Sequence, residues 1–230
     1  MQTKTFSSFV VTDEQIGSDE TGTGDFFGPI VVVAALVTKK TLPLCYQLNI
    51  RDSKRISNQR ILTLSAQIVQ QKLFLYAAIV MSNERYNNAI ARGFNLVQIK
   101  CLLHNTVLNR LYKRYPHVKC FCLDQFVNEK KYYDYLKESK NVIHPHMHIQ
   151  GESYFPSVAV ASVLARYLLL KEYQRLNAKY HLVFPRGSSH QVELFATTLV
   201  QKYSLAVLQT LCKQHFANYR RFWQEYQKKP

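Results

Sequence analysis

Residues 16–37 read IGSDETGTGDFFGPIVVVAALV, and this stretch decides how the first part of the chain folds. The acidic pair Asp19-Glu20 ends a short strand-like segment, and the Gly-rich residues 21–24 follow it directly. Residues 29–37 are then a continuous apolar run rich in β-branched side chains. This order predicts a strand, a turn and a second strand. Because neighbouring strand residues point to opposite faces, both carboxylates can serve one site only if the chain bends at the glycines.

The rest of the chain shows short apolar runs first and longer helical patterns later. Ser57 is placed to cap the first helix. We expect further strands over residues 73–81 and 118–123, and helices over residues 58–71, 84–92, 95–114, 157–180, 192–203 and 205–221. Early strands followed by a strand among helices predict an α/β fold, with a mixed sheet and helices on its faces. No repeat or linker divides the sequence, so we expect one domain over residues 1–230, with residues 1–15 as a polar extension.

The composition predicts a folded protein with a polyanionic partner. Of 230 residues, 47% are hydrophobic and 20% are charged, which excludes a disordered chain. The 30 Lys and Arg against 15 Asp and Glu give a formal charge of +15, so nucleic acid is the first candidate partner and an anionic membrane surface the second. No apolar run approaches the roughly 18 residues of a membrane span, and no secretory signal is evident, so we expect a cytoplasmic protein. Five cysteines, an odd number, indicate reduced thiols.

Two further acids occupy positions where ligand sites form. Asp124 directly follows the apolar run 118–123, and open α/β sheets bind ligands at the carboxyl ends of their strands. Glu152 lies in Gly151-Glu152-Ser153, shortly before the expected helix at residue 157. Structural roles stay open for each acid taken alone: Glu20 as the cap of a turn, Asp124 as a turn residue, and Glu152 as a partner of the helix dipole.

Taken together, the four carboxylates predict a metal site. Clustered carboxylates repel one another and normally need a cation to stay ionised side by side. Oxygen-only ligation favours Mg²⁺ or Mn²⁺. Two such ions, roughly 3.5–4 Å apart, can activate a water and stabilise the leaving oxygen in phosphodiester hydrolysis. An acidic, metal-binding centre in a basic protein is what a nuclease requires.

The stretch from Gly17 to Pro29 closely resembles the active-site signature of bacterial ribonuclease HIII, within the type 2 ribonuclease H family. The motif Gly22-Thr23-Gly24, where Gly-Arg-Gly is the alternative, favours ribonuclease HIII over ribonuclease HII. Further matches follow in the family's order from about residue 16 to 218: Asp52-Ser53-Lys54, Leu123-Asp124, Gly151-Glu152-Ser153 with the helix 158–166, Phe184-Pro185-Arg186-Gly187 and His215-Phe216-Ala217-Asn218.

The resemblance implies an RNase H-like fold, a five-stranded mixed sheet flanked by helices with additional C-terminal helices. It also implies an endoribonuclease that hydrolyses the RNA strand of RNA–DNA hybrids with two metal ions, leaving 5′-phosphate and 3′-hydroxyl ends. The implied metal ligands and catalytic residues are Asp19, Glu20, Asp124 and Glu152. Glutamate at position 152 supports ribonuclease HIII, because ribonuclease HII enzymes carry aspartate there.

The resemblance also implies residues that contact the substrate. Gly22, Thr23 and Gly24 would lie along the minor groove of the hybrid, where the 2′-hydroxyls are displayed. Ser53, Lys54 and Arg186 would contact phosphates or sugars, the alternative being solvated loop residues. The family supplies a further acid after the Phe-Pro-Arg-Gly segment, and Glu193 stands near that place with its role left open.

One departure from the family pattern concerns the N-terminus. Ribonuclease HIII proteins carry an N-terminal substrate-binding domain, whereas 18 residues precede Asp19, so we expect hybrid affinity to come from the basic surface of the catalytic domain. We expect a monomer, with no protein partner evident. Two alternatives remain: cleavage at single ribonucleotides in duplex DNA, as in ribonuclease HII, and a basic nucleic-acid-binding protein that does not cut.

Overall fold

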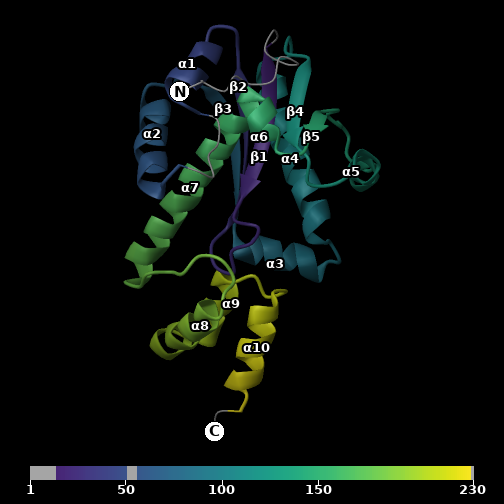
Figure 1. Cartoon of the computed structure of the whole chain (residues 1–230). Coiled ribbons are helices and arrows are strands. Elements are labelled where there is room, and N and C mark those ends of the chain that lie inside the picture. Colours follow the sequence, from purple (N-terminus) through teal and green to yellow (C-terminus); the bar gives the residue numbers. More distant parts are fainter. Residues whose placement is uncertain (1–13, 51–55, 229–230) are drawn as a thin grey trace. The chain divides into compact units, whose positions relative to one another are not determined.

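The computed structural model describes residues 14–50 and 56–228 (Figure 1). Asp52, Ser53 and Lys54 therefore lie outside the described residues. The described chain divides into two compact units, each assembled from three separate segments. The first unit holds the residues up to Glu20, then 31–79 and 96–168, and the second holds 21–30, 80–95 and 169–228.

Five strands form one sheet in the order β3-β2-β1-β4-β5. Their bounds are β1 Gln15–Thr21, β2 Ile30–Val37, β3 Leu75–Met81, β4 Cys120–Asp124 and β5 His146–His148. Strand β4 runs parallel to β1 on one side and to β5 on the other. The register pairs Ser18 with Leu123. The next residues of the two strands, Asp19 and Asp124, therefore lie at neighbouring strand ends. The mixed sheet flanked by helices confirms the predicted fold class.

Helices cover both faces of the sheet in the first unit. On one face, Cys122 of β4 packs with Val158 of α7, Pro156–Tyr180, and with Phe155, which directly precedes this helix. On the other face, Leu123 packs with Cys101 of α4, Leu96–Arg114. Neighbouring strand residues thus face opposite helices, as the two-residue period of a strand requires. All eight residues of β2 are buried for the same reason, which explains why its sequence is continuously apolar.

Four further helices complete the described part of the first unit. They are α1 Leu42–Gln47, α2 Asn58–Gln70, α5 Glu129–Leu136 and α6 Gly151–Tyr154. Of these, only α2 is predicted by the sequence pattern, and the expected cap is confirmed, because the Arg60 amide donates a hydrogen bond to Ser57 Oγ. Gly17 lets α7 approach β1 closely, since a Cβ on this glycine would lie 2.3 Å from Ser157 Oγ.

The second unit contains α3 Asn83–Ala91, α8 Gln191–Lys202, α9 Leu205–Leu211 and α10 Ala217–Tyr226, together with the second half of α7. The single helix expected over residues 205–221 is wrong, because α9 ends at Leu211. Cys212 is extended and forms an antiparallel bridge with Phe27, so its backbone leaves the helix to pair with the segment after the Gly-rich turn.

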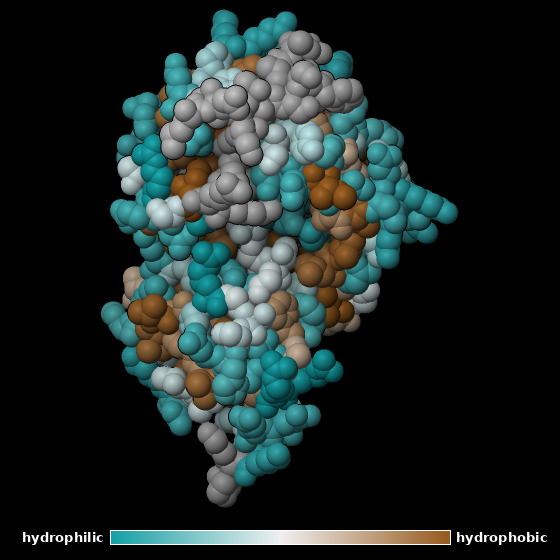
Figure 2. All heavy atoms as spheres, viewed as in Figure 1, coloured by the Kyte–Doolittle hydropathy of each residue, from teal (hydrophilic) through white to brown (hydrophobic). Residues whose placement is uncertain are grey.

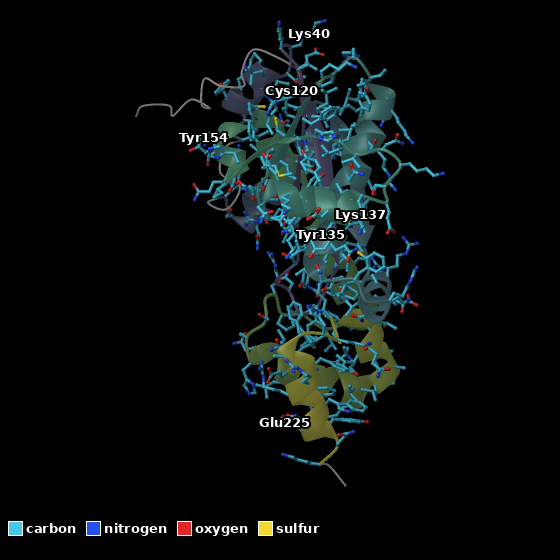
Figure 3. The ribbon with its side chains drawn as sticks, turned by 90° about the vertical axis from the view of Figure 1, so that its right-hand side faces the viewer. Lys40, Cys120, Tyr135, Lys137, Tyr154 and Glu225 are labelled. Atoms are coloured by element: carbon cyan, nitrogen blue, oxygen red, sulfur yellow. The ribbon has the colours of Figure 1, made fainter. Side chains whose placement is uncertain are left out.

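Hydrophilic residues cover much of the face shown in Figure 2, and the cysteines form no disulfide. All five cysteines are free thiols, and even the neighbouring sulfurs of Cys120 (Figure 3) and Cys122 lie 3.9 Å apart, far beyond a disulfide bond. Within the described ranges, no helix is long and apolar enough to cross a membrane.

Candidate active site

Two carboxylates lie side by side at the carboxyl ends of parallel strands. Asp19 lies near the end of β1 with 8% of its surface exposed, and its Oδ1 accepts a hydrogen bond of 2.7 Å from the Glu20 amide. Asp124 ends β4, and its Oδ1 accepts a bond of 2.7 Å from the Gly151 amide. Both side chains therefore accept bonds from backbone amides. The parallel register places them at the same end of two neighbouring strands.

Helix α6 brings the fourth acid next to Asp124. A Cβ on Gly151 would lie 3.0 Å from the Asp124 Cα, so any other residue here would press against the backbone of Asp124. The left-handed backbone of Gln150, with φ of 58°, turns the chain into the short helix. Glu152 follows as a 4% exposed residue. All four acids predicted from sequence thus lie in the first unit, and the charges of Glu20 and Asp124 both act on Asp19.

Burial and neighbouring charge change the acidity of Asp19. Burial raises the pKa of its carboxyl, and the negative charges of Glu20 and Asp124 raise it further, against a hydrogen bond from Ser162, to a value of about 8. Asp19 therefore holds its proton near neutral pH in this arrangement. A cation bound beside this carboxyl would favour its ionised form, because an opposite charge lowers the pKa of an acid.

Two basic residues of α4, Lys100 and His104, hold Glu20. Neither belongs to a motif that was predicted from the sequence. Lys100 Nζ lies 2.5 Å from Glu20 Oε1, and His104 Nε2 donates to Oε2 at 2.9 Å. His104 is fully buried, and its Nδ1 lies 2.8 Å from Ser18 Oγ. Burial alone would raise the pKa of Glu20, but the bond from His104 and the charge of Lys100 outweigh burial and lower it to about 2. The available signal was their four-residue spacing, which puts both on one helix face.

The donor set fits a hard divalent cation. Four carboxylates offer oxygen ligands, and burial together with the charges of Glu20 and Asp124 raises the pKa of Asp19. Across residues 14–50 and 56–228, no three His, Cys, Asp or Glu side chains already converge on a point where an ion could sit. An ion shared by these groups would therefore have to draw the carboxylates closer together.

The predicted substrate-contacting glycines lie in the second unit and differ from each other. Gly22 is buried with φ of +84°, and a Cβ there would lie 2.2 Å from the Pro29 carbonyl oxygen, so the fold itself demands glycine. Gly24 is exposed, and a Cβ there would meet nothing within 4 Å. Thr23 is half-buried between them. Arg186 Nε lies 3.7 Å from Asp25 Oδ2, with 38% of the arginine side chain exposed.

Glu193, whose role the sequence leaves open, links two helices of the second unit by hydrogen bonds. It is 4% exposed on α8. Its Oε1 accepts hydrogen bonds of 2.8 Å from Arg221 Nε and from Asn218 Nδ2, both on α10, and His190 Nδ1 donates to Oε2. These bonds satisfy the buried carboxylate and join α10 to α8.

The raised pKa of Asp19 predicts a stability cost. Its value of about 8 lies above the ordinary 3.8, so folding takes up a proton and stability falls as pH rises from about 4 to 8. Asp19→Asn removes this cost and keeps an oxygen for the Glu20 amide. At pH 8 in EDTA, we expect the variant to melt roughly 5 °C above the unmodified chain, and the gap to shrink towards pH 4. Thermal unfolding followed by circular dichroism measures it, and a gap that stays constant with pH would contradict the account.

Comparison with known proteins identifies the family. A sequence profile described as ribonuclease HII matches residues 16–219. Ribonuclease HIII proteins of Bacillus cereus (strain AH187) and Bacillus anthracis are 37% identical over 207 residues, which are 88% of this chain and 66% of those proteins. The chain thus spans 66% of the length of these curated relatives.

Comparison with solved structures gives the same family. Bst-RNase HIII in complex with Mn²⁺ superposes with a TM-score of 0.89 at 31% identity, covering 95% of this chain and 71% of that one. Ribonuclease H2 from Pyrococcus horikoshii OT3 shares the fold, with a TM-score of 0.77 at 17% identity over 94% of this chain and 100% of that one. These matches confirm the predicted resemblance and the RNase H-like fold. The chain therefore belongs to the ribonuclease HII family, with ribonuclease HIII proteins among its relatives.

Proposed function

We propose that the protein is a metal-dependent endoribonuclease that hydrolyses the RNA strand of RNA–DNA hybrids and leaves 5′-phosphate and 3′-hydroxyl ends. The observation that carries the proposal is the placement of Asp19 and Asp124 at the neighbouring ends of β1 and β4, with the buried Glu152 following Gly151, whose amide bonds to Asp124. An acidic centre of this kind in a chain of net charge +15 suits a polyanionic substrate whose hydrolysis needs cations.

Asp19, Glu20, Asp124 and Glu152 would hold Mg²⁺ or Mn²⁺. Mn²⁺ is bound in the structure of the relative Bst-RNase HIII. Two such ions would supply the activation of the attacking water and the stabilisation of the leaving oxygen. The protein orients two of these carboxylates: the Gly151 amide bonds to Asp124, and His104 bonds to Glu20. Such outer partners set the direction of a ligand and raise its affinity for the ion.

Residues 22–28, called the recognition loop below, would choose the substrate. Gly24 is exposed with open space around it, so its backbone is free to approach a sugar closely. Thr23 and the backbone of Gly22 and Gly24 would read 2′-hydroxyls in the minor groove. Ser53, Lys54 and Arg186 would hold phosphates without sequence preference. We further propose that the protein acts as a cytoplasmic monomer.

Cleavage of three labelled substrates tests this function. With Mg²⁺ and separately with Mn²⁺, we expect the chain to cut an RNA–DNA hybrid at least about 10-fold faster than a DNA duplex with one ribonucleotide, and not to cut double-stranded RNA. The reason is that several consecutive 2′-hydroxyls opposite a DNA strand are needed for full contact. Denaturing gels and end-group analysis measure rates and products, with EDTA as the control.

The outcomes separate the alternatives. Preferred cutting beside the single ribonucleotide would indicate activity like that of ribonuclease HII. If neither ion supports cutting of any substrate while the hybrid still binds, the protein is a binding protein, and the enzymatic proposal is wrong.

A further inference from the structure

Lys213 is a buried cation that the proposed chemistry does not use. Among the lysines and arginines that the structure describes, it alone is buried, with 0% of its surface exposed. Its Nζ donates hydrogen bonds of 2.6 Å to the Asp25 carbonyl and 2.8 Å to the Gly28 carbonyl. Burial lowers the pKa of Lys213 to about 8, and the Asp25 carboxylate limits the shift. Since an ammonium loses its hydration when it is buried, packing alone would favour an apolar residue here.

The hydrogen bonds that Lys213 donates all go to the recognition loop. Besides its two Nζ bonds, the Lys213 amide donates to the Phe26 carbonyl at 2.9 Å. The carbonyl between them, that of Phe27, accepts a bond of 2.8 Å from the Tyr173 hydroxyl. Four consecutive carbonyls, from Asp25 to Gly28, thus find donors, and Lys213 supplies three of the four bonds.

The rest of the loop is tied to the segment that carries Arg186. The Gly187 amide donates to Asp25 Oδ1 at 2.7 Å, and the Phe26 amide donates to the Gly187 carbonyl at 2.8 Å. The turn closes on itself, because the Asp25 amide bonds to the Gly22 carbonyl. With the carbonyls of residues 25–28 held inside the second unit, Gly24 is left exposed at the top of the turn.

We infer that Lys213 is a positioning residue for hybrid recognition: by holding the carbonyls of Asp25 and Gly28, it fixes the shape in which Thr23 and Gly24 meet the RNA strand. The inference rests on the proposed function of the recognition loop. In this inference, Lys213 acts without touching the substrate. Its effect passes through the loop backbone, which keeps one conformation only while its buried carbonyls are satisfied.

Lys213→Met tests the inference, because methionine has a similar length and no donor. We expect KM for the hybrid to rise about 10-fold, with kcat changed by less than about threefold, and the Kd for plain duplex DNA to stay within about twofold. Lys202→Met, at an exposed lysine of α8, is the matched control and should change none of these values. Dissociation constants are measured in EDTA, where cutting does not interfere.

Chemical rescue distinguishes a positioning role from a structural one. Lys213→Ala lacks the atoms of n-propylammonium, so this ion should restore hybrid affinity, whereas n-propanol should not. If the Met variant folds poorly, Tyr173→Phe removes one donor to the same loop and should raise KM for the hybrid by a smaller factor. Equal losses of hybrid and DNA affinity, in proportion to the folded fraction, would overturn the inference. If the unmodified chain shows no preference for hybrid, the proposed function itself fails.

Discussion

Replacing Asp19 or Asp124 by asparagine is expected to reduce hybrid cleavage by roughly 10³-fold or more, while the fold and hybrid binding survive. Asparagine keeps the volume of each side chain and an oxygen for its backbone donor, the Glu20 amide or the Gly151 amide. What it removes is the negative charge that ion ligation requires. Glu20→Gln should be equally severe. Glu152→Gln should also be severe but less complete, since the amide oxygen still ligates weakly.

Asp134→Asn provides the matched control, because Asp134 is an exposed aspartate on α5 of the same unit. Single-turnover cleavage is measured while Mn²⁺ is titrated, and hybrid affinity is measured in EDTA. The control should retain full activity. Rates equal to those of the unmodified chain in the Asp19 or Asp124 variant, at any metal concentration, would refute the site.

Gly22→Ala and Gly24→Val are expected to fail in different ways. At Gly22, the added Cβ meets the Pro29 carbonyl at 2.2 Å in a backbone with φ of +84°, so we expect a fall in Tm of about 5 °C or more and loss of hybrid cleavage. At Gly24, the added side chain meets nothing within 4 Å. We therefore expect unchanged stability, hybrid cleavage lower by at least about 10-fold, and DNA affinity within about twofold, because the side chain obstructs only the approach to a sugar.

Thermal unfolding, hybrid cleavage and binding of plain duplex DNA separate the two effects. The Gly24 variant is the decisive one, since the Gly22 variant changes stability and recognition together. Should Gly24→Val weaken DNA binding as strongly as hybrid binding, the turn is only a structural hinge, and the account of selectivity is wrong.

Local pattern was sufficient for the main elements of the fold. The apolar run of β2 reflects a strand covered on both faces, and the residues before and after the Gly-rich turn form β1 and β2 as predicted. The positions of Asp19 and Asp124 at strand ends also followed from local sequence. Their adjacency did not, because it depends on the parallel pairing of β1 with β4, two strands separated by about a hundred residues.

The wrong helix over residues 205–221 shows where local pattern fails. Its apolar spacing continues past Leu211, yet the Cys212 backbone pairs with Phe27 instead of extending the helix. The Lys213 ammonium is buried against the same segment, although lysine in a sequence predicts an exposed residue. In both cases, hydrogen bonds to a segment distant in the chain outweigh local preference.

The sequence by itself determined the kinds of element, the family signature and the four acids, because periodicity, turn glycines and motif spacing are properties of neighbouring residues. Only the tertiary structure decided that burial raises the pKa of Asp19, that Lys100 and His104 hold Glu20, and that Lys213 bonds to the recognition loop. These facts depend on burial and on distances of a few ångströms between residues far apart in the chain. Electrostatic and hydrogen-bond energies vary steeply over such distances, and sequence spacing does not specify them.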